Sequence, residues 1–212
     1  PENVILSEYD ANDDPSKISV IDNDTISETL VMLNDGLQPL VLNMACDVYP
    51  GGGVKKGCRA QEEDLFRCSN YELCTNKSLY PIGDDEFITT SDVSIIKDTE
   101  YEMLDDFLTV DFIAIPAVKK PLVSDDQYLI SDDYEQMKKK IDSIFRYAIY
   151  QEQDVLLLGA LGCGAYGNPP DKVATMFKEI ITKYENYFTE IRFAILSGGK
   201  NENYEIFKAV LT

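Results

Sequence analysis

Hydrophobic positions along this chain follow two alternating spacings, which predict a succession of strands and helices. Compact apolar runs predict strands at 18–21, 40–42, 109–115, 154–158 and 191–196, with shorter candidates at 87–88 and 93–96. Apolar residues three or four positions apart predict helices at 25–33, 60–73, 134–148, 169–184 and 203–211. Such an alternation is typical of an α/β sandwich.

Two of these helices and one connecting segment carry more specific expectations. The second helix is predicted to turn Leu65, Cys68 and Leu73 inward. Asn168 is predicted to cap the helix that follows it, because two prolines and an aspartate come next, an order that favours a helix start. Residues 121–133 are predicted to form a loop.

The length and charge of the chain narrow the kinds of protein it can be. With 212 residues, 44% of them hydrophobic, it can bury its own core. We therefore expect one domain over 1–212, with the polar, acidic stretch 1–17 as a candidate N-terminal appendage. The 38 acidic and 19 basic residues give a net charge of −19, which argues against direct binding of DNA or RNA. One phosphate-bearing ligand held by backbone amides remains compatible with this charge.

Residue types that are absent or scarce exclude several chemistries. The chain has no histidine, and so no Ser-His-Asp triad, no Cys-His dyad and no histidine-bound zinc or haem. Its five cysteines are odd in number and lack CxxC spacing, so we expect reduced thiols in an intracellular protein, cytoplasmic or nuclear. No signal-peptide pattern, membrane-length apolar run or EF-hand spacing is visible. We therefore expect no membrane contact and no metal site.

Two short motifs in the first third of the chain could form a site. Gly51–Gly53 follows the strand at 40–42, and such glycines let the backbone turn tightly and approach a ligand, although a plain turn would use them too. Seven residues later Gln61–Glu63 opens a helix, where carboxylates also stabilise the helix dipole. Adjacent helical side chains point about 100° apart, so one glutamate could face a ligand while the other steadies it.

A third candidate lies between the strand at 154–158 and the next helix. Gly162, Gly164 and Gly167 have GxGxxG spacing, and the amides of this loop could wrap a diphosphate. A dinucleotide-binding fold would place the motif in its first strand–helix unit, with an acid at a strand end about 20 residues on, and neither condition holds here. No GxxxxGK[ST] motif is present, which excludes a P-loop NTPase.

Taken together, the three motifs have a recognisable order. Gly51–Gly53, seven residues and then Gln61–Glu63 resembles the signature of poly(ADP-ribose) glycohydrolases. Val41–Ala45 precedes the glycines as a strand and short turn do in that family, and 158–168 resembles its second ligand loop. The pairs Pro169-Pro170 and Val173-Ala174 also resemble the sequence pattern of the microbial-type branch of that family. The resemblance covers 40–75 closely and 109–118 and 155–212 more loosely.

This resemblance implies a macrodomain-like three-layer α/β/α sandwich with a mixed central sheet that binds ADP-ribose in a cleft. It implies hydrolysis of the ribose–ribose O-glycosidic bonds of poly(ADP-ribose), with release of ADP-ribose and no cofactor. The family's second glutamate is the general acid/base and its first orients the terminal ribose, which assigns these roles to Glu63 and Glu62. The chemistry agrees, because the leaving oxygen needs a proton that a buried carboxylic acid can supply. We expect a monomer whose partners are ADP-ribose or poly(ADP-ribose) and ADP-ribosylated proteins.

The same resemblance implies a set of ligand contacts, in which Tyr166 stands where Phe is common and would pack against a ribose. The expected ligand-binding residues are Ile26, Ala45, Gly51, Gly52, Gly53, Gln61, Gly162, Cys163, Gly164, Ala165, Tyr166 and Ser197. Cys46 departs from the pattern, because the microbial branch usually has Ser or Asn there, and a polar contact to the ligand or to Glu62 would be weaker or replaced. Without a histidine base, Cys46 is not expected to act as a nucleophile.

Two other functions remain open. The chain could remove single ADP-ribose groups from protein or nucleic acid, or it could bind ADP-ribose without turning it over. The intact pair of glutamates favours an enzyme over a reader.

Overall fold

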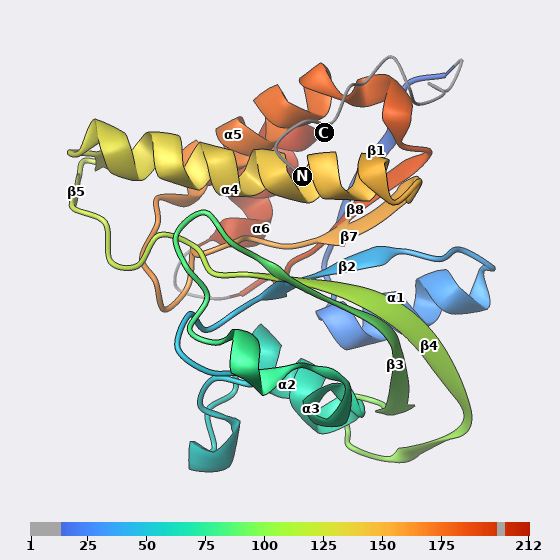
Figure 1. The fold of residues 1–212 in the computed structure, drawn as a ribbon. Helices are drawn as coiled ribbons and strands as arrows, with labels where there is room; N and C mark the ends of the chain where they lie inside the picture. The colour runs from blue at the N-terminus through green and yellow to red at the C-terminus, as the bar shows by residue number, and fades with distance from the viewer. Residues whose placement is uncertain (1–13, 199–201) are drawn as a thin grey trace.

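The computed structural model describes residues 14–198 and 202–212, and the centre of this part is a six-stranded sheet (Figure 1). The strands, in their order across the sheet, are β1 (Lys17–Ile21), β8 (Glu190–Ala194), β7 (Val155–Leu158), β2 (Leu40–Met44), β4 (Met103–Ile115) and β3 (Ile88–Lys97). Neighbours from β1 to β4 pair in parallel, whereas β3 pairs with β4 antiparallel. The expected mixed sheet is therefore confirmed.

Helices cover both faces of this sheet, which gives three layers (Figure 1). One face carries α4, α5 and α6, and the other carries α1, α2 and α3. Their bounds are α1 (Thr25–Asn34), α2 (Gln61–Cys68), α3 (Tyr71–Cys74), α4 (Ser131–Tyr150), α5 (Pro170–Lys183) and α6 (Asn203–Leu211). Short 3-10 turns lie at η2 (Val54–Lys56), η3 (Lys77–Leu79) and η4 (Glu185–Tyr187). This is the three-layer α/β/α sandwich that the family resemblance implies.

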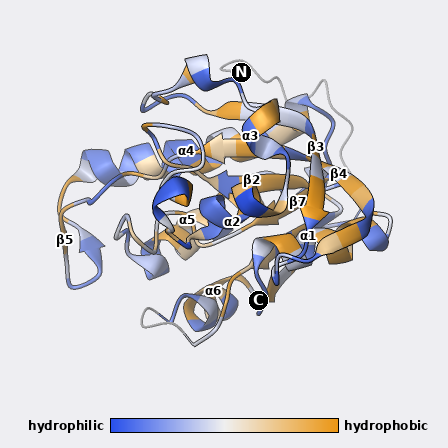
Figure 2. Cartoon of the chain, turned by 90° about the horizontal axis from the view of Figure 1, so that it is seen from below, coloured by the Kyte–Doolittle hydropathy of each residue, from blue (hydrophilic) through white to orange (hydrophobic). Residues whose placement is uncertain are grey.

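The continuous apolar runs of the central strands follow from these two helical layers. Successive side chains of a strand point to opposite faces. Leu156 and Leu158 pack with α4 to α6, while Val155 and Leu157 pack with α1 to α3, so β7 needs an apolar residue at every position. Figure 2 shows hydrophobic residues concentrated on the strands, with hydrophilic residues on the outer turns.

The prediction that one helix runs from about 60 to 73 is wrong. Helix α2 ends at Cys68. The Asn70 side chain then accepts a hydrogen bond from the backbone N–H of Ser94 on β3 at 2.9 Å. This turn resets the helical phase, so α3 buries Tyr71 and leaves Leu73 86% exposed. Leu73 therefore does not face inward.

Two further expectations for the connections are also wrong. Pro169, and not Asn168, precedes α5 at the capping position, because the buried Asn168 side chain is used elsewhere. It donates to the backbone oxygens of Val118 at 2.7 Å and Gly162 at 3.2 Å, and accepts from the Tyr128 hydroxyl at 2.8 Å. The segment 121–133 is not a plain loop. It contains a hairpin of β5 (Val123–Ser124) and β6 (Gln127–Tyr128), and α4 already begins at Ser131.

Some expectations concern parts of the chain that the structure does not describe. Residues 1–13 of the predicted appendage lie outside the described residues, and Lys17 already belongs to β1. The single domain over 1–212 remains a prediction. None of the five cysteines forms a disulfide. The helices within 14–198 and 202–212 are all too short or too polar to cross a lipid bilayer.

Candidate active site

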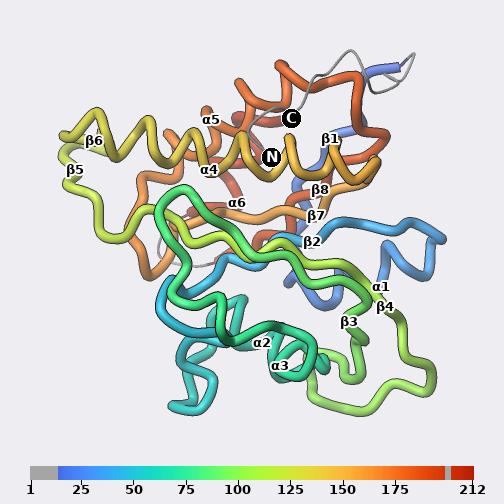
Figure 3. The backbone as a smooth tube through the Cα atoms, in the orientation of Figure 1, coloured from blue at the N-terminus to red at the C-terminus, as the bar shows by residue number. Residues whose placement is uncertain are grey.

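A cavity of about 550 Å³ lies at the carboxyl ends of the parallel strands. Its walls come from the segments that follow β1, β2, β4, β7 and β8, together with the first turn of α2. Figure 3 shows that β2 and β7, although far apart in the chain, run in the same direction and end on the same side. This edge is where open α/β sheets bind their ligands, and the volume suits a small molecule.

The glycine run brings the backbone against both glutamates of the Gln61–Glu63 motif. Gly52 has a positive φ of +49°, and a Cβ atom there would lie 2.7 Å from Oε1 of Glu63 and 3.0 Å from Oε2 of Glu62. The first distance is shorter than real carbon–oxygen contacts and the second is tight, so any side chain at this position would displace the carboxylates.

Glu62 is the more enclosed carboxylate and accepts three hydrogen bonds. They come from the backbone N–H of Cys46 at 2.8 Å and of Gly51 at 3.2 Å, and from the Asn43 side chain at 3.4 Å. Burial raises the pKa of Glu62 to about 7, against the effect of these donors, which favour the charged form. Glu62 can therefore hold a proton near neutral pH.

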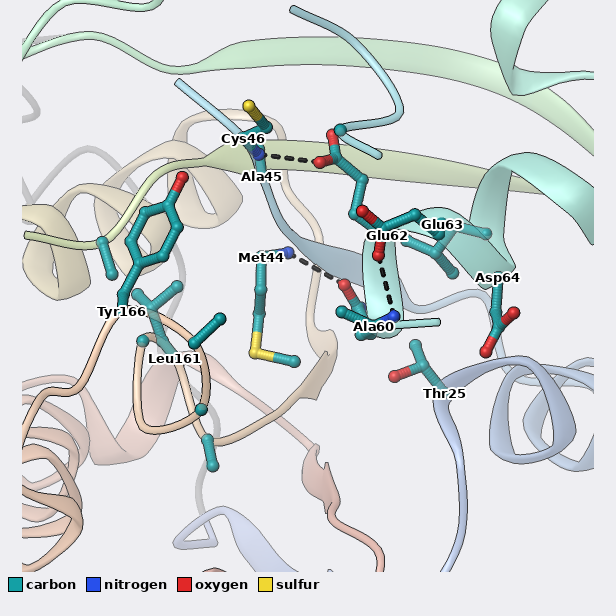
Figure 4. Close-up of a pocket in the computed structure, with 18 of the residues that line it drawn as sticks. Thr25, Met44, Ala45, Cys46, Ala60, Glu62, Glu63, Asp64, Leu161 and Tyr166 are labelled. Atoms are coloured by element: carbon teal, nitrogen blue, oxygen red, sulfur yellow. Dashed lines mark hydrogen bonds between the residues drawn. The ribbon is translucent and has the colours of Figure 1, made fainter. Parts of the chain in front are cut away.

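Glu63 accepts one backbone hydrogen bond on each oxygen. The N–H of Gly53 lies 2.8 Å from Oε1, and the N–H of Ala60 lies 2.8 Å from Oε2. The segment 53–60 therefore begins and ends on this one carboxylate, which Figure 4 shows beside Glu62 at the cavity. The preceding Gln61 joins α2 to β2, since it accepts from the N–H of Met44 at 3.0 Å and donates to the oxygen of Leu42 at 2.6 Å.

The loop after β7 faces the glutamates across the cavity, where Figure 4 shows Leu161 and Tyr166. The backbone N–H groups of Gly164, Ala165 and Tyr166 make no hydrogen bond within the part of the chain that the structure describes. Consecutive free amides that line a cavity are suited to an anionic group. Asp47 fixes this loop, because its Oδ1 accepts from the Tyr166 hydroxyl and from Lys119 Nζ, each at 3.1 Å.

Most of the residues predicted for the site lie together at the cavity. Those that line it are Ile26, Ala45, Gly52, Gly53, Gln61, Glu62, Glu63, Gly162, Gly164, Ala165 and Tyr166. Three predicted residues do not. Gly51 is packed against Phe66, the Cys163 side chain is buried in the core, and the exposed Ser197 hydrogen-bonds to Asp22.

The backbone N–H groups of the glycine run serve the glutamates. Those of Gly51 and Gly53 donate to Glu62 and Glu63, respectively. Cys46 contacts Glu62 through its backbone N–H, so the contact does not depend on which side chain stands there.

Sequence reasoning missed several residues of this site. Arg59, Lys119 and Asn203 line the cavity, and the buried Asn43 supports Glu62 from behind. Arg59 had a signal in the sequence, since it is a cation between two candidate motifs of an acidic chain. Among the described residues, no cluster of three or more cysteine, aspartate or glutamate side chains is arranged to hold a metal ion.

Comparisons with known proteins find similarity to poly(ADP-ribose) glycohydrolases. Residues 4–95 match the family model described as microbial-type PARG, catalytic domain. The fold is similar to the crystal structure of poly(ADP-ribose) glycohydrolase from Deinococcus radiodurans in complex with ADP-ribose, with a TM-score of 0.82, 25% identity, and coverage of 92% of this chain and 84% of that one. It is also similar to poly(ADP-ribose) glycohydrolase from Thermomonospora curvata, with a TM-score of 0.80, 23% identity, and coverage of 97% and 81%. No curated protein matches the chain in sequence.

Proposed function

Since the chain resembles microbial-type poly(ADP-ribose) glycohydrolases in sequence and in fold, we propose that it hydrolyses the ribose–ribose O-glycosidic bonds of poly(ADP-ribose) and releases ADP-ribose. The observation that carries this proposal is the placement of two carboxylates on one side of a cavity, opposite a row of free backbone amides. The carboxylates suit a sugar and the amides suit a diphosphate.

In the proposed reaction, the carboxylic acid of Glu63 donates its proton to the leaving ribose oxygen as the bond from the anomeric carbon breaks. The departing chain thereby gains a hydroxyl group. The Glu63 carboxylate then takes a proton from water, whose oxygen bonds to the anomeric carbon. The mechanism needs no other proton carrier, which agrees with a chain that has no histidine.

Glu62 is proposed to bind the hydroxyl groups of the terminal ribose. Its three hydrogen-bond donors fix the carboxylate, and Asn43 holds it from the buried side. The free amides of Gly164 to Tyr166 would hold the diphosphate, and Tyr166 would pack on the ribose. A substrate fixed at both ends presents its scissile bond to Glu63, and such positioning supplies much of the rate.

The proposal is tested by incubating the protein with labelled poly(ADP-ribose) and, in parallel, with a protein that carries single ADP-ribose groups. We expect free ADP-ribose to be released from the polymer. Release from the singly modified protein alone would make the chain a mono-ADP-ribosyl hydrolase. Binding of the polymer without any release would make it a reader, and either result overturns the proposal.

Replacing Gly52 tests the close approach of the backbone to the two carboxylates. In Gly52→Ala the new methyl group would overlap Glu63 and Glu62, so the carboxylates must shift. We expect kcat/KM to fall about tenfold to a hundredfold, because small displacements of a catalytic group are costly. Gly36→Ala is the matched control, since Gly36 has a positive φ of +82° and open space around it. Equal activity in the two variants would contradict this reading.

A further inference from the structure

Basic residues are scarce in this chain and yet gather in one short segment. The whole sequence has 19 of them among 212 residues, but Lys55, Lys56 and Arg59 fall within the few positions between Gly51–Gly53 and Gln61–Glu63. We call these three residues the basic lip. A net charge of −19 repels a polyanion from most of the surface. Cations that no nearby carboxylate neutralises therefore mark the places where a polyanion could bind.

The basic lip is fixed next to the proposed catalytic group. Both ends of its segment donate a backbone hydrogen bond to Glu63, from Gly53 and from Ala60, each at 2.8 Å. Figure 4 shows the bond from Ala60. Arg59 itself lines the cavity, and Lys56 is exposed. A part of a substrate that leaves the cavity beside Glu63 would therefore lie close to the segment that carries these cations.

Two cations of the basic lip are also free of partners. Most basic side chains in the described part of the chain have a carboxylate, carbonyl or hydroxyl partner, and Lys55 is among them, with Glu72 at 3.4 Å. The side chains of Lys56 and Arg59 form no hydrogen bond or ion pair with any residue within 14–198 and 202–212. Their charge is therefore available to an external anion.

The chemistry of the proposed substrate supplies that anion. Glu63 protonates an oxygen of the next ribose in the polymer, and the 5′ carbon of that ribose carries a diphosphate. In the proposed binding mode, this diphosphate lies outside the cavity, on the leaving-group side of Glu63. Resting on the proposed function, we propose that Lys56 and Arg59 bind the diphosphate of the unit next to the terminal ADP-ribose. The basic lip thereby favours a polymer end over free ADP-ribose.

The test compares two ligands in the double variant Lys56→Gln/Arg59→Gln. One is a chain of two ADP-ribose units, which has the proposed second diphosphate, and the other is free ADP-ribose, which lacks it. We expect kcat/KM for the two-unit chain to fall about threefold for each exposed charge contact removed, hence about tenfold in total. The Kd of ADP-ribose is expected to change less than about twofold. The salt dependence of kcat/KM on the two-unit chain is expected to weaken as well.

Lys97→Gln is the matched control. The Lys97 side chain also has no hydrogen-bond or ion-pair partner among the described residues. The Lys97 backbone pairs in register with Met103 at the start of β4, at the end of the sheet opposite the cavity. Its replacement is expected to leave both measurements unchanged. The proposal is overturned if the double variant behaves like Lys97→Gln, or if the Kd of ADP-ribose rises as much as kcat/KM falls, which would place the cations on the terminal unit.

Failure of the proposed function gives a different result. In that case the wild-type protein itself releases no ADP-ribose from the two-unit chain. The comparison is then read from the Kd values of the two-unit chain and of ADP-ribose. A weaker Kd for the two-unit chain alone in the double variant supports the basic lip, and equal changes for both ligands overturn it.

Discussion

Glu63→Gln is expected to release ADP-ribose from poly(ADP-ribose) about 10² to 10⁴ times more slowly than the wild type, while it still binds ADP-ribose. The amide has nearly the shape of the carboxylic acid, but it can neither give a proton to the leaving oxygen nor take one from water. Binding persists because the amides of Gly164 to Tyr166 belong to a different loop. Single-turnover rates and the Kd of ADP-ribose separate the two effects.

The local geometry adds a smaller effect that the controls must isolate. Both oxygens of Glu63 accept backbone hydrogen bonds, so a glutamine turns its NH₂ group toward the N–H of either Gly53 or Ala60. One end of the segment 53–60 is then loosened. Glu135→Gln, at an exposed position of α4, controls for the loss of a negative charge and is expected to retain full activity. A rate for Glu63→Gln within about tenfold of the wild type would show that another group supplies the proton.

The parts of the fold that the sequence predicts well are those with a local cause. β7 carries four consecutive apolar residues because helices cover both faces of the sheet. A run of that kind predicts a buried strand from the sequence alone. The expected start and end of α6, at Asn203 and Leu211, agree with the structure. The glycine and glutamate motifs also belong together in space, since the strand before one and the helix that begins with the other are joined by Gln61.

The errors have causes that lie far away along the chain. The spacing of Leu73 from Leu65 and Cys68 predicts that it faces inward, but a hydrogen bond between Asn70 and β3 separates α2 from a new helix. Asn168 looks like a helix cap, and its side chain instead joins two distant backbone oxygens. No local pattern contains such partners.

The electrostatics of the site depend on the fold in the same way. Two adjacent glutamates are indistinguishable in a sequence, but the structure gives Glu62 three donors from β2 and its following loop, and gives Glu63 two from the ends of one segment. The raised pKa of Glu62 comes from burial beneath these loops. The sequence likewise cannot show that the Arg59 side chain lacks an ion-pair partner, because this depends on where the fold puts the carboxylates of the described residues.

The second large effect concerns stability and comes from Glu62. Burial raises its pKa from 4.5 to about 7, so the folded state binds this proton more tightly than the unfolded chain does. A carboxyl group of this kind stabilises the folded state fully below the unfolded pKa, and this stabilisation is lost as the pH rises through the folded pKa. We expect the unfolding free energy of the wild type, relative to that of Glu62→Gln, to fall by about 2 to 3 kcal/mol between about pH 5 and about pH 8.

Urea denaturation of both proteins at the two pH values measures this change, and a constant difference would mean that Glu62 keeps an ordinary pKa in the folded state. Glu190→Gln is the contrasting control at another buried glutamate. Burial raises the pKa of Glu190, but the hydrogen bonds and charges of Arg192 and Lys17 together outweigh burial, so the pKa is lowered. The stabilisation by Glu190 is present above its unfolded pKa and is lost only as the pH falls through the folded one. The difference in unfolding free energy between the wild type and Glu190→Gln is therefore expected to stay nearly constant over the same pH interval. In that interval the unfolding free energy of the wild type falls relative to that of Glu62→Gln.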